Sequence, residues 1–134
     1  MPGITGYATY VPCYRLDRAD AAAAVGEKAK ATRAVAGYDE DTTSMAVEAG
    51  RNALRGRDLA IDQLYFATAA PAYLDKTNAT TVHAGLVLGE HVLAADFGGA
   101  VRSGVAALLA AANSNATTLV ALSDTRTGLP GGGD

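Results

Sequence analysis

The chain has 134 residues, enough for one domain with an apolar core, and its 49% apolar and 19% charged residues exclude a disordered protein. A formal net charge of −3 gives no basic footprint for nucleic acid or for an anionic membrane surface. Cys13 is the only cysteine, which excludes an internal disulfide and a cysteine-based metal site, and no metal is expected. The amino-terminal residues lack the basic and apolar regions of a secretion signal, so we expect a cytoplasmic location.

Hydrophobic spacing and turn residues predict alternating strands and helices. In chain order the patterns predict a strand at 3–11 that Pro12 ends, a helix from about Asp17 that Gly26 interrupts, a helix within 37–56, a strand at 63–70, a helix at 78–90, a strand at 92–99, a helix at about 102–112 and a strand at 117–125. This alternation predicts an α/β fold in which a mixed, mostly parallel sheet packs between helices. The unbroken apolar runs at 64–67 and 117–122 are typical of central strands.

The ends of two helices carry recognisable signals. The helix within 37–56 follows three acidic residues, Thr42 or Thr43 can cap it, and arginines lie at its end, as the helix dipole favours. The acidic residues are Asp39, Glu40 and Asp41, and this capped start explains them without a catalytic role. In the helix at 78–90, Asn78 is the expected cap and Gly89 the expected stop.

The segment LAADFGGAVRSGVAALLAAAN, residues 93–113, is the most informative part of the chain. Its glycines, Gly98 and Gly99, allow a sharp corner between strand and helix. The helix that follows is apolar on every side, and residues 105–112 are far fewer than the roughly 20 that a membrane span needs, so we expect it to be buried. Such a corner gathers backbone N–H groups and often presents a nucleophile, but this one carries no Ser, Cys or Thr in the sequence GGAV.

Five stretches together resemble one protein family in their order and spacing. They are GITGYATYVPCYRL, GYDEDTTSMAVEAGRNAL, LYFATAAP, TNATTV and DFGGAVRSGVAALLAA. Over residues 1–127 the chain resembles the amino-terminal half of thiolase-fold, hydroxymethylglutaryl-CoA synthase-like proteins. The resemblance implies a longer, dimeric protein with two similar halves, each a five-stranded sheet between helices. We therefore expect this chain to be a fragment, one piece of a split protein or part of a polypeptide, with residues 128–134 a glycine-rich tail.

The same resemblance implies that the usual catalytic groups are replaced. The family's nucleophilic cysteine corresponds to Val101, and its glutamate acid/base corresponds to Ala69, while its histidine belongs to the second half. Valine has no nucleophilic atom and alanine moves no proton, so condensation through a cysteine thioester cannot run on these residues. No catalytic residue is therefore assigned in this chain.

The substrate-binding candidates are three residues at the glycine corner and one in the loop after the strand at 63–70. They are Gly98, Gly99, Arg102 and Tyr73. Backbone N–H groups at the corner can hold the oxygen of a coenzyme A thioester, which is the expected substrate or ligand; no covalently bound cofactor is expected. Arg102 either meets a CoA phosphate or pairs with a carboxylate. Tyr73, Asp75 and Lys76 line the pocket mouth if the resemblance holds, or form an ordinary polar loop.

Two functions remain open at this point. One is an acyltransferase-family enzyme of acyl-CoA metabolism without the cysteine chemistry, working as a retro-aldol lyase on 3-hydroxyacyl-CoA beside a zinc-ribbon/OB-fold partner protein. The other is a non-catalytic thiolase-like subunit that supports a partner in a complex. The resemblance also implies a homodimer, or a heterodimer with a thiolase-like subunit, formed through the strand at 92–97.

The remaining reactive side chains have structural explanations. Cys13 has no histidine near it in sequence and is expected to be an incidental thiol. His83 and His91 are too far apart for a helical metal pair, which usually has a spacing of three or four residues. Asp96, in a strand expected to be buried, needs a hydrogen-bond partner, and we expect it to support the fold.

Overall fold

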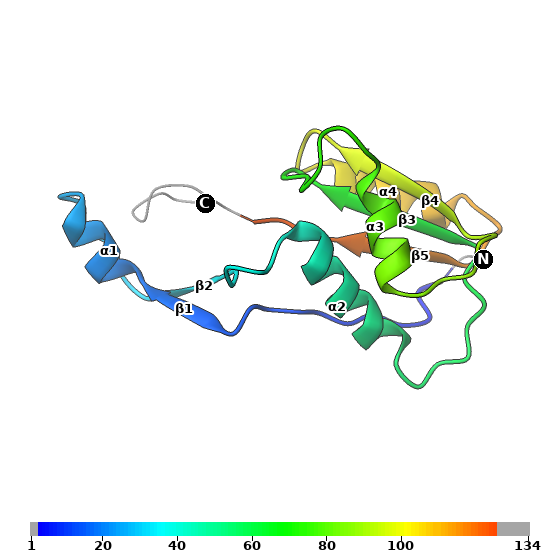
Figure 1. The fold of residues 1–134 in the computed structure, drawn as a ribbon, viewed down its shortest axis with the longest axis horizontal. Helices are drawn as coiled ribbons and strands as arrows, with labels where there is room; N and C mark the ends of the chain where they lie inside the picture. The colour runs from blue at the N-terminus through cyan, green and yellow to red at the C-terminus, as the bar shows by residue number, and fades with distance from the viewer. Residues whose placement is uncertain (1–2, 126–134) are drawn as a thin grey trace. The chain divides into compact units, whose positions relative to one another are not determined.

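The computed structural model describes residues 3–125, which form two compact units. One unit comprises residues 3–10 and 41–124, and the other comprises residues 11–40 with Thr125. The predicted glycine-rich tail at 128–134 lies outside the described residues. Figure 1 shows the elements by label.

The smaller unit is a pair of antiparallel strands joined through a short helix. Its elements are β1 (Tyr14–Asp17), α1 (Arg18–Ala24) and β2 (Thr32–Val35). The Asp17 side chain caps α1 by accepting from the Ala19 N–H at 2.8 Å. The predicted helix is therefore correct only up to Ala24. Gly26 follows it with φ +76°, and the sequence TRAV then pairs as a strand, since β-branched residues favour an extended backbone.

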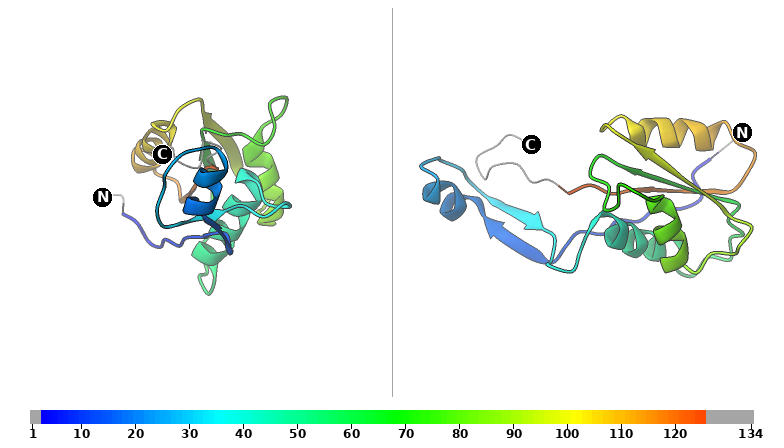
Figure 2. Two further views of the ribbon diagram at one scale, coloured as in Figure 1. Left: turned by 90° about the vertical axis from the view of Figure 1, so that its left-hand side faces the viewer. Right: turned by 45° about the horizontal axis from the view of Figure 1, so that its top comes forward.

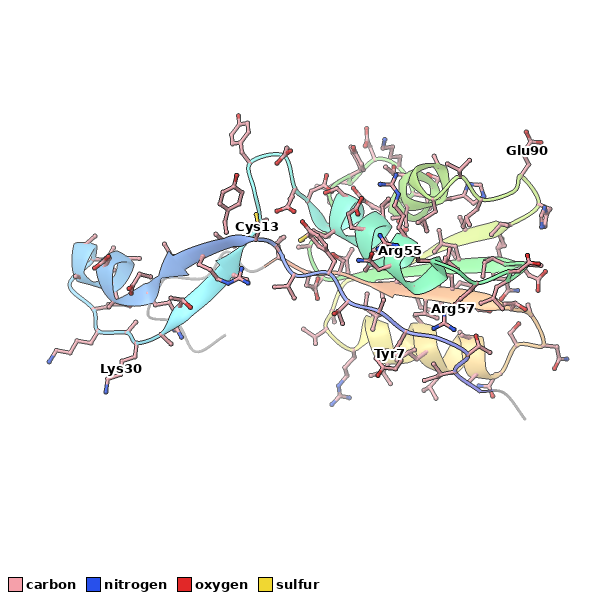
Figure 3. The ribbon with its side chains drawn as sticks, turned by 90° about the horizontal axis from the view of Figure 1, so that it is seen from below. Tyr7, Cys13, Lys30, Arg55, Arg57 and Glu90 are labelled. Atoms are coloured by element: carbon pink, nitrogen blue, oxygen red, sulfur yellow. The ribbon has the colours of Figure 1, made fainter. Side chains whose placement is uncertain are left out.

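The strand predicted at 3–11 is wrong. Residues 3–11 form no strand, because no strand of the described chain pairs with them to complete a ladder. Within the larger unit, the Arg57 guanidinium donates from Nη1 to the Thr5 carbonyl at 3.0 Å. Figure 3 shows Arg57 beside the segment that carries Tyr7.

The larger unit contains a three-stranded parallel sheet covered on both faces. The strands β3 (Gln63–Thr68), β4 (Leu93–Gly98) and β5 (Thr118–Leu122) lie in the order β4-β3-β5. The helices α2 (Thr42–Leu54) and α3 (Asn78–Gly85) cover one face, and α4 (Ser103–Ala112) covers the other (Figure 2). These layers confirm the predicted α/β architecture and its parallel sheet.

The core lies between the sheet and the α2–α3 layer. Leu64 and Phe66 of β3 are fully buried and pack in one apolar cluster with side chains from both helices and the other two strands. This burial confirms 64–67 as a central strand. The central position predicted for 117–122 is wrong within the described residues, since β5 pairs only with β3 and lies at the sheet's edge.

Two helix caps differ from the predicted ones. Asp41, not a threonine, caps α2: its carboxylate accepts from the Ser44 N–H at 2.7 Å, and the Ser44 hydroxyl accepts from the Asp41 N–H at 2.8 Å. Asn78 lies inside α3 rather than capping it, and α3 ends at Gly85 rather than near Gly89.

Candidate functional site

The carboxyl ends of β3 and β4 meet at one edge of the sheet. Their parallel register pairs Thr68 with Gly98, so that Ala69 and Gly99 each follow the end of a strand at neighbouring positions. Ala69 and the glycine corner, which are 30 residues apart in sequence at Gly99, therefore follow neighbouring strand ends. In open α/β sheets, ligands bind outside the carboxyl ends of the strands. This carboxyl edge is the candidate site.

The glycine corner is a tight turn held by Ser103. Gly99 has φ +96°, a conformation that side chains rarely adopt, so the glycine is required at this position. The Ser103 hydroxyl donates to the Gly98 carbonyl at 2.9 Å, and the Ser103 N–H donates to the Ala100 carbonyl at 2.9 Å. Arg102 is the N-cap of α4 but makes no side-chain cap. The helix α4 begins at Ser103, after a short turn at residues 101–102, so the predicted order of strand, corner and helix is present.

Val101 and Ala69, the positions that the resemblance predicts for the family's reactive groups, carry inert side chains. Val101 lies in the turn before α4 and is 71% exposed, and Ala69 follows β3 and is also exposed. Neither side chain offers a nucleophile or a transferable proton. The strand, the corner and the helix are present, and the side chains of Val101 and Ala69 add no reactive group to them.

A hydrogen-bond network that the sequence reasoning missed fixes the residues around Ala69. The Asp124 carboxylate accepts from the Ala69 N–H at 2.6 Å and from the Thr68 hydroxyl at 3.0 Å. The Thr68 hydroxyl in turn accepts from the Ala70 N–H at 3.0 Å, and the Thr42 hydroxyl donates to the Ala70 carbonyl at 2.9 Å. The signal that was available is an acid placed directly after an apolar strand, in the sequence LSD.

The loop after Ala70 is anchored at Asn78. The buried Asn78 amide accepts from the Tyr73 N–H at 2.9 Å and donates to the Tyr73 carbonyl at 2.9 Å. The Lys76 ammonium lies 3.7 Å from the centre of the Tyr73 ring, a cation–π contact. The structure therefore explains Tyr73 and Lys76 as parts of an ordered loop beside the carboxyl edge.

Asp96 has the fold-supporting role that was expected, but it does not have the expected burial. Its carboxylate accepts from the Asn78 N–H at 2.7 Å and the Ala79 N–H at 2.6 Å, which are donors at the start of α3. The Asp96 carboxylate therefore caps α3 from β4, because the N-cap residue Thr77 makes no side-chain hydrogen bond to the helix. Asp96 is nevertheless exposed, which corrects the prediction of a buried position.

The prediction that α4 is a buried helix is wrong for the described chain. Only Ala107 is buried, while Val105 and Leu109 are each 59% exposed and Leu108 is 46% exposed. The inner side of α4 packs on the sheet, but no other part of residues 3–125 covers the outer side. An apolar outer face of this kind is characteristic of an interface.

The other reactive side chains form no site. The exposed thiol of Cys13 is free, and the His83 ring lies 3.0 Å through Nε2 from the Gly89 carbonyl. No group of three or more histidine, cysteine or acidic side chains suited to a metal occurs among residues 3–125.

Partial burial acts to raise the pKa of Asp41, but hydrogen bonds from Thr43 and Ser44 outweigh it and hold the pKa below its usual value. Across residues 3–125, every helix is too short or too polar to cross a membrane.

Solved structures share this fold over most of the chain. A structure of MvaS in complex with 3-hydroxy-3-methylglutaryl coenzyme A matches 95% of this chain and 35% of its own, with a TM-score of 0.81 and 28% identity. A 3-oxoacyl-(acyl-carrier-protein) synthase III matches 88% of this chain and 40% of its own, with a TM-score of 0.76 and 23% identity. The fold is therefore thiolase-like.

Sequence comparison gives the particular relationship. The hydroxymethylglutaryl-CoA synthase of Methanocella arvoryzae is 35% identical over 144 aligned positions, and that of Pyrococcus furiosus is 34% identical over 114. These alignments cover 96% and 81% of this chain but 42% and 33% of the relatives, so the chain spans well under half of their length. No model of a known protein family matches. The chain is hydroxymethylglutaryl-CoA synthase-like, over the amino-terminal portion of those relatives.

Proposed function

We propose that this chain forms the amino-terminal part of an acyl-CoA-binding protein that does not carry out cysteine-dependent condensation. The observation that carries the proposal is that the strands leading to Ala69 and Val101 end side by side, with Thr68 paired to Gly98 and a glycine corner at Gly99. Binding needs N–H donors and a shaped corner, whereas acyl transfer needs a nucleophile and a proton carrier. The chain supplies the first set and lacks the second.

The thioester oxygen would lie against the backbone N–H groups at the start of α4. Partial positive charge gathers at a helix N-terminus, and Gly99 allows a ligand to approach the backbone closely. Arg102, exposed at the same corner, is placed to meet a phosphate of coenzyme A. Support for this ligand comes from the MvaS structure, which holds a coenzyme A thioester.

Two functions are compatible with such a site. In a retro-aldol cleavage, a base removes the β-hydroxyl proton of a 3-hydroxyacyl-CoA, the Cα–Cβ bond breaks, and the thioester stabilises the resulting enolate. No acyl-enzyme forms, so the loss of the cysteine is compatible with this reaction if the base comes from outside these residues. The second candidate is a non-catalytic subunit, which the loss of both reactive groups also favours.

Binding and mass measurements separate these possibilities. We expect acetyl-CoA to bind saturably in calorimetry, with no acyl adduct in the intact mass. Arg102→Ala should weaken binding, whereas Arg55→Ala, an exposed arginine at the end of α2, should not. Release of a ketone or aldehyde from 3-hydroxyacyl-CoA would establish the lyase, and its absence with partner proteins present would establish the subunit. A covalent acyl adduct on the unmodified protein would refute the proposal.

We further propose that β4 forms a dimer interface, with a second copy or with a related subunit. Within the described residues β4 pairs only with β3, so its outer backbone edge is unpaired, and Leu93 at its start is 55% exposed. Leu93→Lys should reduce dimer formation in analytical ultracentrifugation. Leu122→Lys, a similarly exposed leucine on β5, is the matched control and should leave the dimer intact.

A further inference from the structure

A concavity lies at the opposite end of the sheet from the glycine corner, where β3 and β4 begin. It has a volume of about 320 Å³, at the lower end of the range for small-molecule sites. The end of α2, the loop before β3, the turn after α3 and the start of β4 contribute its lining. The lining residues are Leu54, Arg57, Leu59, Ala60, Ile61, Val87, Leu88, Gly89, His91 and Val92. We call this concavity the amino-end pocket.

The floor of the amino-end pocket is part of the apolar core. Ile61 and Val92 are buried, and Leu54 and Leu88 pack against the same cluster, so the floor is held in place by the fold. Val87 lies at the rim, where its side chain is 87% exposed. An apolar floor with an apolar rim open to solvent favours a ligand with an apolar body.

The charge of the lining is positive in a chain whose net charge is negative. Arg57 and His91 line the pocket and no acidic residue does, although the chain has 14 acidic and 11 basic residues. Three acids are next to lining residues in the sequence: Asp58 is exposed and does not line the pocket, Asp62 accepts from the Thr117 N–H at 2.8 Å, and Glu90 extends away from the molecule (Figure 3). Within residues 3–125, neither Arg57 nor His91 forms an ion pair.

We propose that the amino-end pocket binds a small amphipathic carboxylate. The alkyl chain would lie on Ile61, Leu88 and Val92, and the carboxylate would lie near Arg57 and His91. The Arg57 guanidinium has five N–H donors, and the Thr5 carbonyl takes one of them, so further donors remain for a carboxylate. This site is separate from the carboxyl edge and does not depend on the function proposed there.

Octanoate is a suitable probe, because it has a carboxylate and a short apolar chain. In a ¹H–¹⁵N NMR titration we expect saturable shifts at the amides of Val87, Leu88 and His91. Octanol, which lacks the charge, should bind more weakly. Arg57→Leu should weaken octanoate binding about two- to fivefold, as expected for a partly exposed ion pair, and Arg55→Leu, which does not line the pocket, should not.

A second pair of variants keeps the test valid if Arg57→Leu disturbs the fold. Val87 is exposed and tolerates charge, so Val87→Asp should weaken octanoate binding and Val87→Lys should strengthen it. Absence of saturable shifts, shifts confined to other regions, or equal octanoate affinity in the two Val87 variants would overturn the proposal. Equal binding of octanol would overturn the assignment of an anion.

Discussion

Replacing Asp41 by alanine tests the helix start that holds α2 in the larger unit. The carboxylate accepts from the Ser44 N–H at 2.7 Å and from the Thr43 hydroxyl at 2.6 Å, and the backbone N–H of Asp41 donates to the Ser44 hydroxyl. Loss of an N-cap residue lowers the free energy of unfolding by about 1 kcal/mol. Because Asp41 also forms a capping box and its pKa is lowered, we expect its loss to cost closer to about 2 kcal/mol. We therefore expect Asp41→Ala to lower the free energy of unfolding by about 1–2 kcal/mol.

The pH dependence of this difference follows from the lowered pKa. A carboxyl whose pKa is lower in the folded state stabilises the fold above its unfolded value of 3.8, and the stabilisation is lost as the pH falls through the folded pKa. Urea unfolding followed by circular dichroism should show the full difference at neutral pH and a smaller one in acid. Asp39→Ala, an exposed acid two residues earlier, is the matched control. Equal effects of the two variants, or a difference that does not shrink in acid, would refute this reasoning.

Three further outcomes concern the carboxyl edge. In thermal unfolding, Gly99→Ala should destabilise the protein by about 1–2 kcal/mol, because φ at this residue is +96°. Gly98→Ala should be tolerated, because its added Cβ would meet only the Thr68 carbonyl, at 4.0 Å. Equal effects of the two substitutions would contradict the assigned turn. Asp124→Ala should speed hydrogen exchange at the Ala69 amide, while Asp124→Asn, which keeps an acceptor, should not; an unchanged rate in Asp124→Ala would refute the network. Val101→Cys alone should yield no condensation product from acetyl-CoA and acetoacetyl-CoA, because Ala69 still has no acid/base group. An acyl-enzyme that turns over in that variant would refute the assignment of Val101 and Ala69 to the family's catalytic positions.

The sequence predicted the elements that depend on local signals. The parallel β3, β4 and β5, the α2 helix and the Gly98–Gly99 corner follow from apolar runs and turn residues, and all are present. The N-cap of α2 is harder to predict, because Asp41 and Thr42 are both good N-cap residues and only the structure shows the extended backbone of Asp41 and its bond to Ser44.

The errors concern features that depend on distant partners. Residues 3–11 have strand-forming alternation, but a strand forms only by pairing with another strand, and these residues pair with none of the described strands. The apolar composition of α4 predicts that the helix is covered on all sides, but it does not show which part of the protein covers it. Within the described residues the outer side of α4 is exposed. The Asp124 network links residues 55 positions apart, and spacing along one chain does not reveal such a pairing.

Chemical-shift mapping with acetyl-CoA tests the central claim most directly. If the corner is a thioester cradle without a nucleophile, titration should shift the amides of Gly98, Gly99 and Ser103 saturably, and removal of the ligand should restore the original spectrum. Shifts that leave these three amides unchanged, or that persist because an acyl group has become attached to the protein, would contradict the account.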